Sequence, residues 1–249
     1  MKKVISLCFI GALGVLLLMV MASMPRMGDP QSPTNTRVID RYLEGAEEET
    51  GTENVITGVI LNYRGYDTMG EVTVIFTGLA AVLAVLGRER RGRIHAYPDR
   101  SPIRPSIIVR SAVSFLLPFI VLFSLYTVLH GEISPGGGFQ GGAVLAAGMF
   151  VFAAAFGLWR AGRTVPPWLR YAVEGAAPVT FFLVGAAGLV GGAEFLTYML
   201  PKASAGLQPS LRTWMTLLVE GGIGAGGAMI FLSILMAMAR EEDAGGQAA

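Results

Sequence analysis

Cysteine and histidine are nearly absent from this sequence. Cys8 is its one cysteine, and His95 and His130 are its two histidines. A single cysteine excludes an intrachain disulfide and a Cys-x-x-Cys metal or redox motif. With only these two histidines, neither a structural zinc site nor a haem held by a histidine pair is expected. We therefore expect this chain to bind no metal and no redox cofactor.

Charge is also scarce. Charged residues make up 15% of the 249 residues, hydrophobic residues make up 53%, and the mean hydropathy is +0.56. Soluble domains usually carry about 25% charged residues, so much of this chain is expected to face lipid. One membrane span takes about 20 apolar residues, so the length suits several helices with short connections.

Sequence motifs for catalysis are missing as well. No GxxxxGK[ST] or GxGxxG run follows a strand-like segment, and such runs are what nucleotide binding requires. The glycines at 136–138 lie between apolar segments, which is the wrong context for a phosphate loop. No catalytic constellation is recognisable, so we expect neither an enzyme nor a nucleic-acid-binding protein.

Apolar runs predict an all-α, polytopic membrane protein with about six transmembrane helices. The runs cover residues 4–22, 69–87, 107–129, 141–158, 171–192 (with a possible extension to 200) and 215–238. The first run follows Lys2 and Lys3, so a cleaved signal peptide is an alternative to a retained anchor. Its apolar stretch is longer than the usual signal core of about 7–15 residues, which favours the anchor.

The basic residues predict the orientation of the spans. Arginine is concentrated in the segment 88–110, and further basic residues follow the fourth and sixth spans. The positive-inside rule places these segments in the cytoplasm, so both termini are predicted to be cytoplasmic and the protein to lie in the cell membrane. The inner residues would be Arg88, Arg90, Arg91, Arg93, Arg100, Arg104, Arg110, Arg160, Arg163, Arg170 and Arg240.

Polar segments divide the chain. Residues 23–51 contain three prolines and an acidic cluster, which predicts a solvated extramembrane loop. The basic segment after the second span separates a two-span part, residues 1–92, from a four-span part, residues 93–249. Six short spans without broken-helix pairs make a poor transporter on their own, which favours a subunit of a larger assembly.

Glu220 is the clearest carboxyl within a predicted span. It lies in the outer third of the sixth span, on the predicted face of Gly224 and Gly227, while Gly222 and Gly226 form a GxxxG pair. Such glycines allow a second helix to approach closely. An acidic group inside a bilayer is costly, so Glu220 is either an ion or proton relay or an interhelical hydrogen-bonding group.

Glu174 offers a second intramembrane carboxyl. It lies near the inner start of the fifth span, one turn after Arg170 and one turn before Pro178. A pair with the nearby arginine and a place in an ion path both remain open. Pro178 is expected to kink this helix and free a carbonyl.

The glycine-rich segment 130–142 predicts a tight turn, because glycine permits positive φ and close backbone contact. It places His130 and Glu132 at the end of the third span. Histidine titrates near neutral pH, so these two residues could gate or shuttle protons. The alternative is a turn that only locks two helices together. The glycines expected to pack helices are Gly136, Gly137, Gly138, Gly141, Gly142, Gly222 and Gly226.

A further acidic group lies at the outer end of the second span. Asp67 and Glu71 are one helical turn apart, and Arg64 is close enough in sequence to neutralise one of them. They could form an access point for a cation or belong to a folded interfacial turn.

Two motifs carry a family resemblance. Residues 130–142 read His-Gly-Glu-Ile-Ser-Pro-Gly-Gly-Gly-Phe-Gln-Gly-Gly, which resembles the HG-x-x-x-PGGGFQGG signature of the MnhB/MrpB subunits of Mrp-type Na⁺/H⁺ antiporters and related membrane-bound hydrogenases. Residues 63–71 read Tyr-Arg-Gly-Tyr-Asp-Thr-Met-Gly-Glu. This run is similar to the FRGFDTLGE segment at the end of the large Mrp subunit and in the small MbhE-type hydrogenase subunit.

The resemblance implies a fusion of an MbhE-like segment with an MnhB-like, four-span domain. It implies Na⁺ and H⁺ as transported ions, and other Mrp/Mbh-type membrane subunits as partners. The large antiporter-like subunits carry the family's pumping residues, so this chain is not expected to transport ions alone. Two alternatives stay open: a membrane-arm subunit of a ferredoxin-linked hydrogenase or respiratory complex, and a purely structural adaptor. The candidates for the ion path are Asp67, Glu71, His130, Glu132, Glu174 and Glu220.

Overall fold

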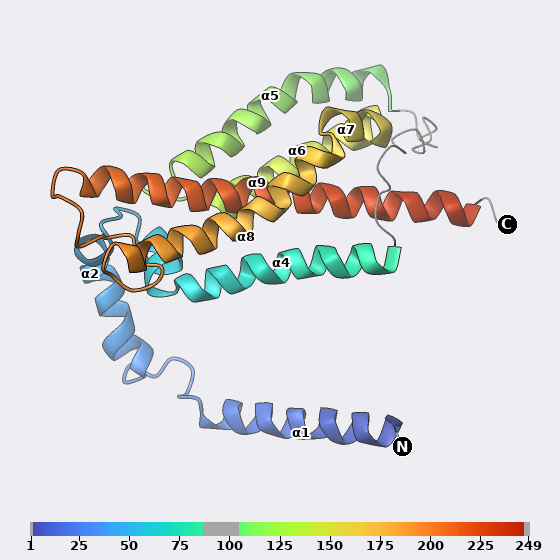
Figure 1. Ribbon diagram of the computed structural model, residues 1–249. Helices are drawn as coiled ribbons and strands as arrows, with labels where there is room; N and C mark the ends of the chain where they lie inside the picture. Colours follow the sequence, from blue (N-terminus) through green and yellow to red (C-terminus); the bar gives the residue numbers. More distant parts are fainter. Residues whose placement is uncertain (1, 87–104, 247–249) are drawn as a thin grey trace. The chain divides into compact units, whose positions relative to one another are not determined.

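The computed structural model describes residues 2–86 and 105–246 (Figure 1). These residues are largely helical and contain no β-strand, so the all-α prediction is confirmed. The predicted boundary at residue 92 and the arginines from 88 to 104 lie outside the described residues. The chain divides into two compact units, Met1–Glu44 and Gly45–Ala249.

The first unit contains helix α1 (Lys2–Ser23), the short η1 (Thr34–Val38) and the start of α2 (Ile39–Thr50). None of the span in α1 is buried, as expected for an apolar helix that contacts lipid. The prediction of a loop over residues 23–51 is wrong in its second half, where η1 and α2 form. Alanine, leucine and glutamate are good helix formers, and α2 is rich in them.

The second unit begins with α3 (Val55–Thr57) and η2 (Gly58–Tyr63), which lead into α4 (Gly65–Leu86). After the undescribed segment come α5 (Ile107–Leu129), α6 (Gly138–Phe156), α7 (Leu158–Thr164), α8 (Pro167–Val190) and α9 (Gln208–Gly246). Six helices of the described chain are long and apolar enough to cross a membrane: α1, α4, α5, α6, α8 and α9. The six predicted spans are confirmed, and the orientation of the termini stays a prediction.

The ends of the spans differ from the predictions where glycines determine the backbone. Helix α8 stops at Val190, so the extension to Leu200 is wrong. Gly192 adopts a φ of +82°, which glycine takes without the steric cost of other residues. The chain then folds back, and Lys202 N–H donates to the Gly191 carbonyl at 3.2 Å. At Gly157, a φ of +90° separates α6 from the unpredicted α7.

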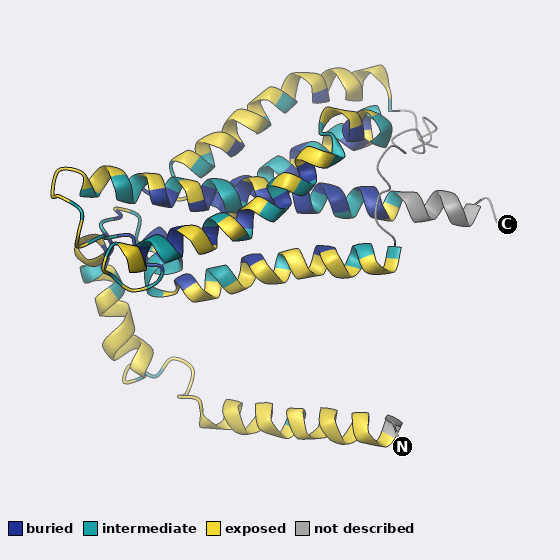
Figure 2. Ribbon diagram, viewed as in Figure 1, coloured by how far each residue is buried: buried dark blue, intermediate teal, exposed yellow. Residues whose placement is uncertain are grey.

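Helix α9 is the centre of the second unit. It packs against α8, α6, α4 and α5 (Figure 1). More than half of its membrane span is buried, whereas α4 and α5 expose most of their surface (Figure 2). A central, largely buried helix is the natural place for polar groups that lipid would not tolerate.

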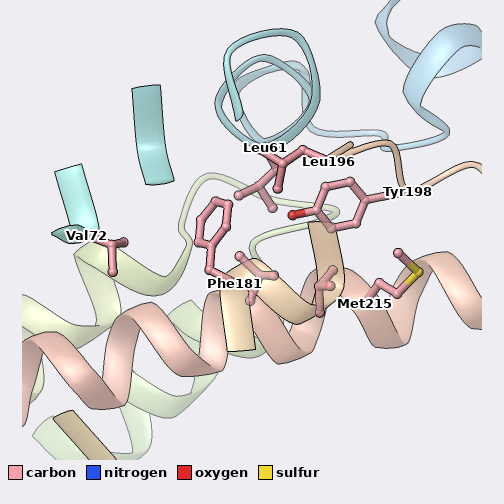
Figure 3. Packing of buried hydrophobic residues seen from close by; sticks show 8 residues of the cluster. Leu61, Val72, Phe181, Leu196, Tyr198 and Met215 are labelled. Atoms are coloured by element: carbon pink, nitrogen blue, oxygen red, sulfur yellow. The ribbon is translucent and has the colours of Figure 1, made fainter. Parts of the chain in front are cut away.

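A hydrophobic cluster joins the N-terminal segment to the C-terminal helices. The side chains in Figure 3 converge from η2, α4, α8, α9 and the connection after α8. Between membrane helices such side chains are held by van der Waals packing rather than by removal from water. The cluster therefore packs the segment before α4 against the N-terminal part of α9. Its buried members are Leu61, Val72, Phe181, Val184, Leu196, Tyr198, Met215 and Val219.

Candidate functional site

The site is built on the turn that links α5 to α6. Helix α5 ends at Leu129, with His130 as its C-cap, and α6 begins at Gly138. Gly137 has a φ of +130°, and its N–H donates to the Thr127 carbonyl at 3.1 Å. A Cβ on Gly136 would overlap that same carbonyl. The glycines thus let the turn fold back onto the last turn of α5.

Glu220 of α9 reaches the start of α6. Its side chain accepts a hydrogen bond from the N–H of Gly138, and the residue is only 2% exposed. The N-cap of α6 is Gly137, which has no side chain to offer the first N–H groups of the helix. Glu220 therefore supplies from another helix what the capping residue lacks.

The second oxygen of Glu220 is free of hydrogen bonds. Its Oε1 atom is buried and has no partner among the described residues. The hydroxyl of Tyr198, in the connection between α8 and α9, is buried and likewise has no partner in the described part of the chain. Burial, together with the charge of Glu220, raises the pKa of the Tyr198 phenol. The N-terminal part of α9 and the connection before it therefore contain a carboxyl and a phenol with unused hydrogen-bonding capacity among the described residues.

Small residues allow α6 and α9 to pack closely at Glu220 and along the residues that follow it in α9. Gly138 lies against the backbone of Glu220, and a Cβ on Gly142 would meet the backbone of Gly224 at 2.6 Å. Ala146 and Ala228 continue the same row in one buried cluster.

The glycine pair of α9 serves another neighbour. Cβ atoms on Gly222 and Gly226 would meet Ala177 of α8. Gly227, seven residues after Glu220, has open space where a Cβ would lie, so the close helix approach predicted for the face of Glu220 does not extend to Gly227. Contact follows the row of residues four apart, 220, 224 and 228, because such rows form the ridges of packed helices. On the α5 side of the hairpin, a Cβ on Gly141 would meet the Ser124 carbonyl at 2.8 Å.

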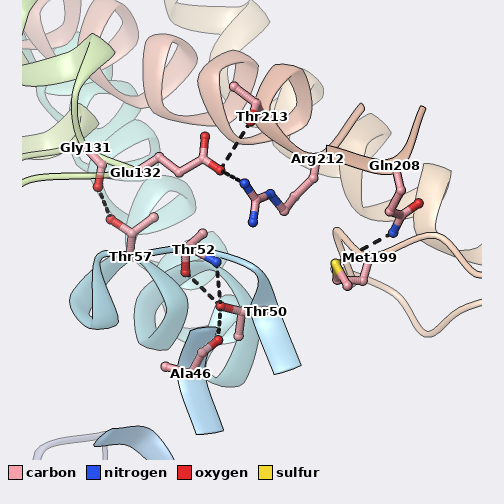
Figure 4. Close-up of polar contacts among 10 residues, drawn as sticks. All are labelled: Ala46, Thr50, Thr52, Thr57, Gly131, Glu132, Met199, Gln208, Arg212 and Thr213. Atoms are coloured by element: carbon pink, nitrogen blue, oxygen red, sulfur yellow. Dashed lines mark hydrogen bonds and ion pairs between the residues drawn. The ribbon is translucent and has the colours of Figure 1, made fainter. Parts of the chain in front are cut away.

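His130 and Glu132 are close in sequence, but the structure gives their side chains different partners. Glu132 is buried and forms an ion pair with Arg212 at 2.6 Å, and the Thr213 hydroxyl donates to it at 3.3 Å (Figure 4). The ring of His130 stacks on Tyr126 with centroids 4.1 Å apart. The two residues therefore do not form a proton-sharing pair.

A segment missed by the sequence analysis holds the turn from the other side. Asn54 N–H donates to the Glu132 carbonyl at 3.0 Å. Its amide nitrogen Nδ2 donates to the carbonyls of Gly131 and Ser134 at 2.8 and 2.7 Å. The Thr57 hydroxyl also donates to the Gly131 carbonyl (Figure 4). The sequence signal was an asparagine before a short helix, which predicts an N-cap, and Asn54 does cap α3.

The remaining candidates lie in two other places. At the start of α4, Asp67 pairs with Arg64 at 2.6 Å, as the sequence suggested, and Glu71 is exposed. On α8, Glu174 is buried and accepts a hydrogen bond from Ser233 of α9. Ser233 is thirteen positions after Glu220, or about 20 Å along a helix with a rise of 1.5 Å per residue. The interface of α8, α9 and α6 thus contains two separate buried carboxyls.

No group of three or more His, Cys, Asp or Glu side chains that could hold a metal ion occurs within the described residues. The polar groups that the structure places at this site are the Glu220 carboxyl, the Tyr198 phenol and the backbone N–H of Gly138.

Two family models match the chain over adjoining segments. Residues 108–239 match a domain related to the MnhB subunit of the Na⁺/H⁺ antiporter. Residues 7–97 match the MbhE model, which describes one of the subunits of MBH. Both resemblances that the motifs indicated are confirmed.

Curated relatives agree with the first match. The chain is 28% identical to an uncharacterised protein of Methanocaldococcus jannaschii, over 57% of this chain and 59% of the relative. It is 27% identical to a probable A/B-type subunit of a K⁺/H⁺ antiporter from Rhizobium meliloti, over 57% and 16%. It is 34% identical to the B-type subunit of the Na⁺/H⁺ antiporter from Bacillus subtilis, over 37% and 64%. The chain thus spans less than two thirds of each of these relatives.

Solved structures resemble nearly the whole chain. A chain of the membrane-bound sulfane sulfur reductase, an archaeal respiratory membrane complex, superposes with a TM-score of 0.65 at 28% identity, over 95% of this chain and 97% of that one. A chain of the Mrp complex from Dietzia sp. superposes with a TM-score of 0.62 at 24% identity, over 95% and 26%. The second likeness concerns the fold.

Proposed function

Because the chain belongs to the family of MnhB-related Na⁺/H⁺ antiporter subunits, we propose that it is a membrane subunit of a cation/proton antiporter-type module. In this role it contributes to the path of Na⁺ and H⁺ and to assembly with other Mrp/Mbh-type membrane subunits. It is a transport subunit of the cell membrane, without a catalytic centre or bound cofactor of its own.

The observation that carries the proposal is the environment of Glu220. Its carboxyl lies within a span, buried and hydrogen-bonded to the first residue of α6. The start of a helix carries partial positive charge, which stabilises an anion there. One carboxyl oxygen is thus anchored, and the other, Oε1, has no partner among the described residues. That oxygen can take up a proton or contribute to the shell of a monovalent cation.

The other candidates lie in different surroundings. Glu132 and Asp67 are neutralised by Arg212 and Arg64, so we assign them to the structure of the turn and of the start of α4. Glu174 and Glu71 join Glu220 as path candidates. Glu174 lies nearer the inner end of the α8–α9 interface, and Glu71 is on the exposed face of α4, open to a neighbouring subunit.

Replacing Glu220 with glutamine tests the proposal. Glutamine keeps the size of the side chain and an oxygen that accepts from Gly138, but it cannot exchange a proton. We expect Glu220→Gln to reduce Na⁺-driven proton movement in inverted membrane vesicles by at least about tenfold, the scale of losing one strong transition-state contact. Glu194→Gln, at an exposed position between spans, is the matched control.

The amount of assembled complex in the same membranes separates the outcomes. Lost transport with a normal complex supports a path through Glu220. Normal transport would contradict it. A complex that falls apart in the Glu220→Gln variant would favour the purely structural adaptor.

A second candidate is a respiratory membrane complex as the parent assembly. It is favoured by the 0.65 TM-score with a chain of such a complex, of which 97% is covered. Gentle purification from native membranes followed by mass spectrometry distinguishes the two. Co-purifying iron–sulfur or hydrogenase-type subunits would identify a respiratory assembly, and antiporter-like subunits alone would identify a stand-alone exchanger.

A further inference from the structure

We propose that the two parts of this chain, matched by separate family models, bind each other through a specific non-covalent latch. The latch consists of Asn54 and Thr57 from the N-terminal part and the carbonyls of Gly131, Glu132 and Ser134 from the α5–α6 turn. The chain segment between α4 and α5 is then not what holds the parts together. This inference concerns association and does not depend on ion transport.

The hydrogen bonds match donors to acceptors one by one. The turn after α5 lies outside the helices, and it presents the carbonyls of Gly131, Glu132 and Ser134 to the donors of Asn54. Asn54 meets these carbonyls with its backbone N–H and both hydrogens of its amide, at 2.7 to 3.0 Å. Its Oδ1 atom accepts from Ile56 N–H at 3.0 Å, which fixes the orientation of the amide.

Burial makes the hydrogen bonds of Asn54 and Thr57 to the turn selective for a segment that carries both donors. Thr57 is fully buried, and its hydroxyl shares the Gly131 carbonyl with Asn54 (Figure 4). A buried carbonyl that loses its donor cannot recover a hydrogen bond from water. A partner segment without the two donors would therefore leave the turn unsatisfied, and this is how an interface discriminates between partners.

A third element covers the same segment. Arg212 of α9, which pairs with Glu132, also packs over Gly51, where a Cβ would overlap its guanidinium group. Gly51 has a φ of +74°. The segment from Gly51 to Thr57 thus contacts both the turn and α9. The hydrophobic cluster around Leu61 and Phe181 continues the contact beyond the latch (Figure 3).

The latch also positions the candidate site. The turn that it holds leads directly to Gly137 and Gly138, and the N–H of Gly138 binds Glu220. Asn54 and Thr57 are therefore positioning residues for the start of α6, although they touch neither the carboxyl nor an ion.

Cleaving the full chain tests the latch. A recognition sequence for a site-specific protease is inserted between residues 92 and 93, and the chain carries an affinity tag at its C-terminus. After purification in mild detergent and complete cleavage, we expect the untagged N-terminal fragment to remain on the affinity resin with the C-terminal fragment. Separation of the wild-type fragments on cleavage would overturn the proposal.

Two substitutions probe the donors in the same cleaved protein. Asn54→Asp keeps the oxygen that caps α3 but turns the two amide donors into an acceptor facing carbonyls. Thr57→Val removes one hydroxyl at nearly constant volume. Each should lower the retained N-terminal fragment at least about fivefold, since an unsatisfied buried group and a lost hydrogen bond shift an equilibrium by that order.

The controls make the same chemical changes elsewhere. Asn35→Asp alters an amide that donates to the Asp29 carbonyl, and Thr73→Val alters a hydroxyl that donates within α4. Both should retain the fragment as the wild type does. If Asn54→Asp and Thr57→Val also retain it fully, apolar packing alone holds the parts together and the latch is refuted.

Discussion

The carboxyl of Glu220 accepts a hydrogen bond from the backbone N–H of Gly138, a residue 82 positions earlier in the chain. The contact requires that both partners come unusually close, because the missing Cβ of Gly138 would overlap the backbone of Glu220. One glycine thereby brings a helix start, with its partial positive charge, against a buried acidic side chain. The close packing of α6 on α9 and the favourable charge interaction of Glu220 with the start of α6 therefore both depend on Gly138.

Adding a methyl group at residue 138 should separate the two helices. We expect Gly138→Ala to lower the free energy of unfolding in detergent by about 1–3 kcal/mol, the usual cost of overpacking. Gly227→Ala is the matched control, because open space surrounds Gly227. The higher helix propensity of alanine should leave that variant unchanged or stabilise it by up to about 1 kcal/mol. Equal thermal unfolding midpoints for the two variants would contradict the close α6–α9 contact.

Loss of either partner of the Glu132–Arg212 ion pair should lower the free energy of unfolding strongly, because both side chains are largely buried. Removing one partner of a buried pair costs about 3–5 kcal/mol, since an uncompensated charge remains. We expect Glu132→Gln and Arg212→Gln each to destabilise the protein by about that amount, and the double variant to cost clearly less than their sum. Asp67→Asn breaks the exposed pair with Arg64, and it should cost less than about 1 kcal/mol. Additive effects at 132 and 212 would count against the pair.

The membrane spans could be predicted from sequence because lipid imposes a simple rule. A chain that crosses the hydrocarbon core needs about 20 consecutive apolar residues and must satisfy its backbone internally. Each run that met this rule became a helix, and the glycine turn at 136–138 joined two of them. The sequence also indicated that Arg64 could neutralise either Asp67 or Glu71, and in the structure it pairs with Asp67, three residues away.

Contacts between distant segments could not be predicted in the same way. Asn54 and the turn that it holds are about 80 positions apart, and an asparagine before a helix already has a local explanation as a cap. The sequence places His130 two residues from Glu132, whereas the ion-pair partner of Glu132 in the structure is Arg212 of α9. The face of α9 depends on which residues form the packed row, and this row includes Ala228 rather than Gly227.

Ser233 should stabilise the buried carboxyl of Glu174. Its hydroxyl donates to Glu174 between α9 and α8. We expect Ser233→Ala to lower the free energy of unfolding by about 1–3 kcal/mol, because the buried carboxyl loses a donor that water cannot replace. Ser23→Ala, which removes an exposed hydroxyl bonded to its own helix, should change stability by less than about 0.5 kcal/mol. A negligible effect at 233 would show that the hydrogen bond to Glu174 contributes little.

Tyr198 should make the protein sensitive to alkali. Burial, and secondarily the charge of Glu220, raises the pKa of its phenol in the folded state, whereas the unfolded chain has the ordinary value near 10. Below that value the phenol is neutral in both states and its contribution is fully present. As the pH rises above about 10, only the unfolded state releases the proton, so stability falls by up to about 1.4 kcal/mol per pH unit from this group.

Tyr198→Phe isolates that contribution. At neutral pH it should be neutral or stabilise the protein by up to about 1 kcal/mol, because the buried hydroxyl has no hydrogen-bond partner among the described residues and its desolvation is uncompensated. Above pH 10 the variant should lose stability less steeply than the wild type, since phenylalanine has no proton to release. Unfolding curves at pH 7, 10 and 11 measure both effects. Parallel slopes for the two proteins would mean that the phenol ionises as readily in the folded state as in the unfolded chain.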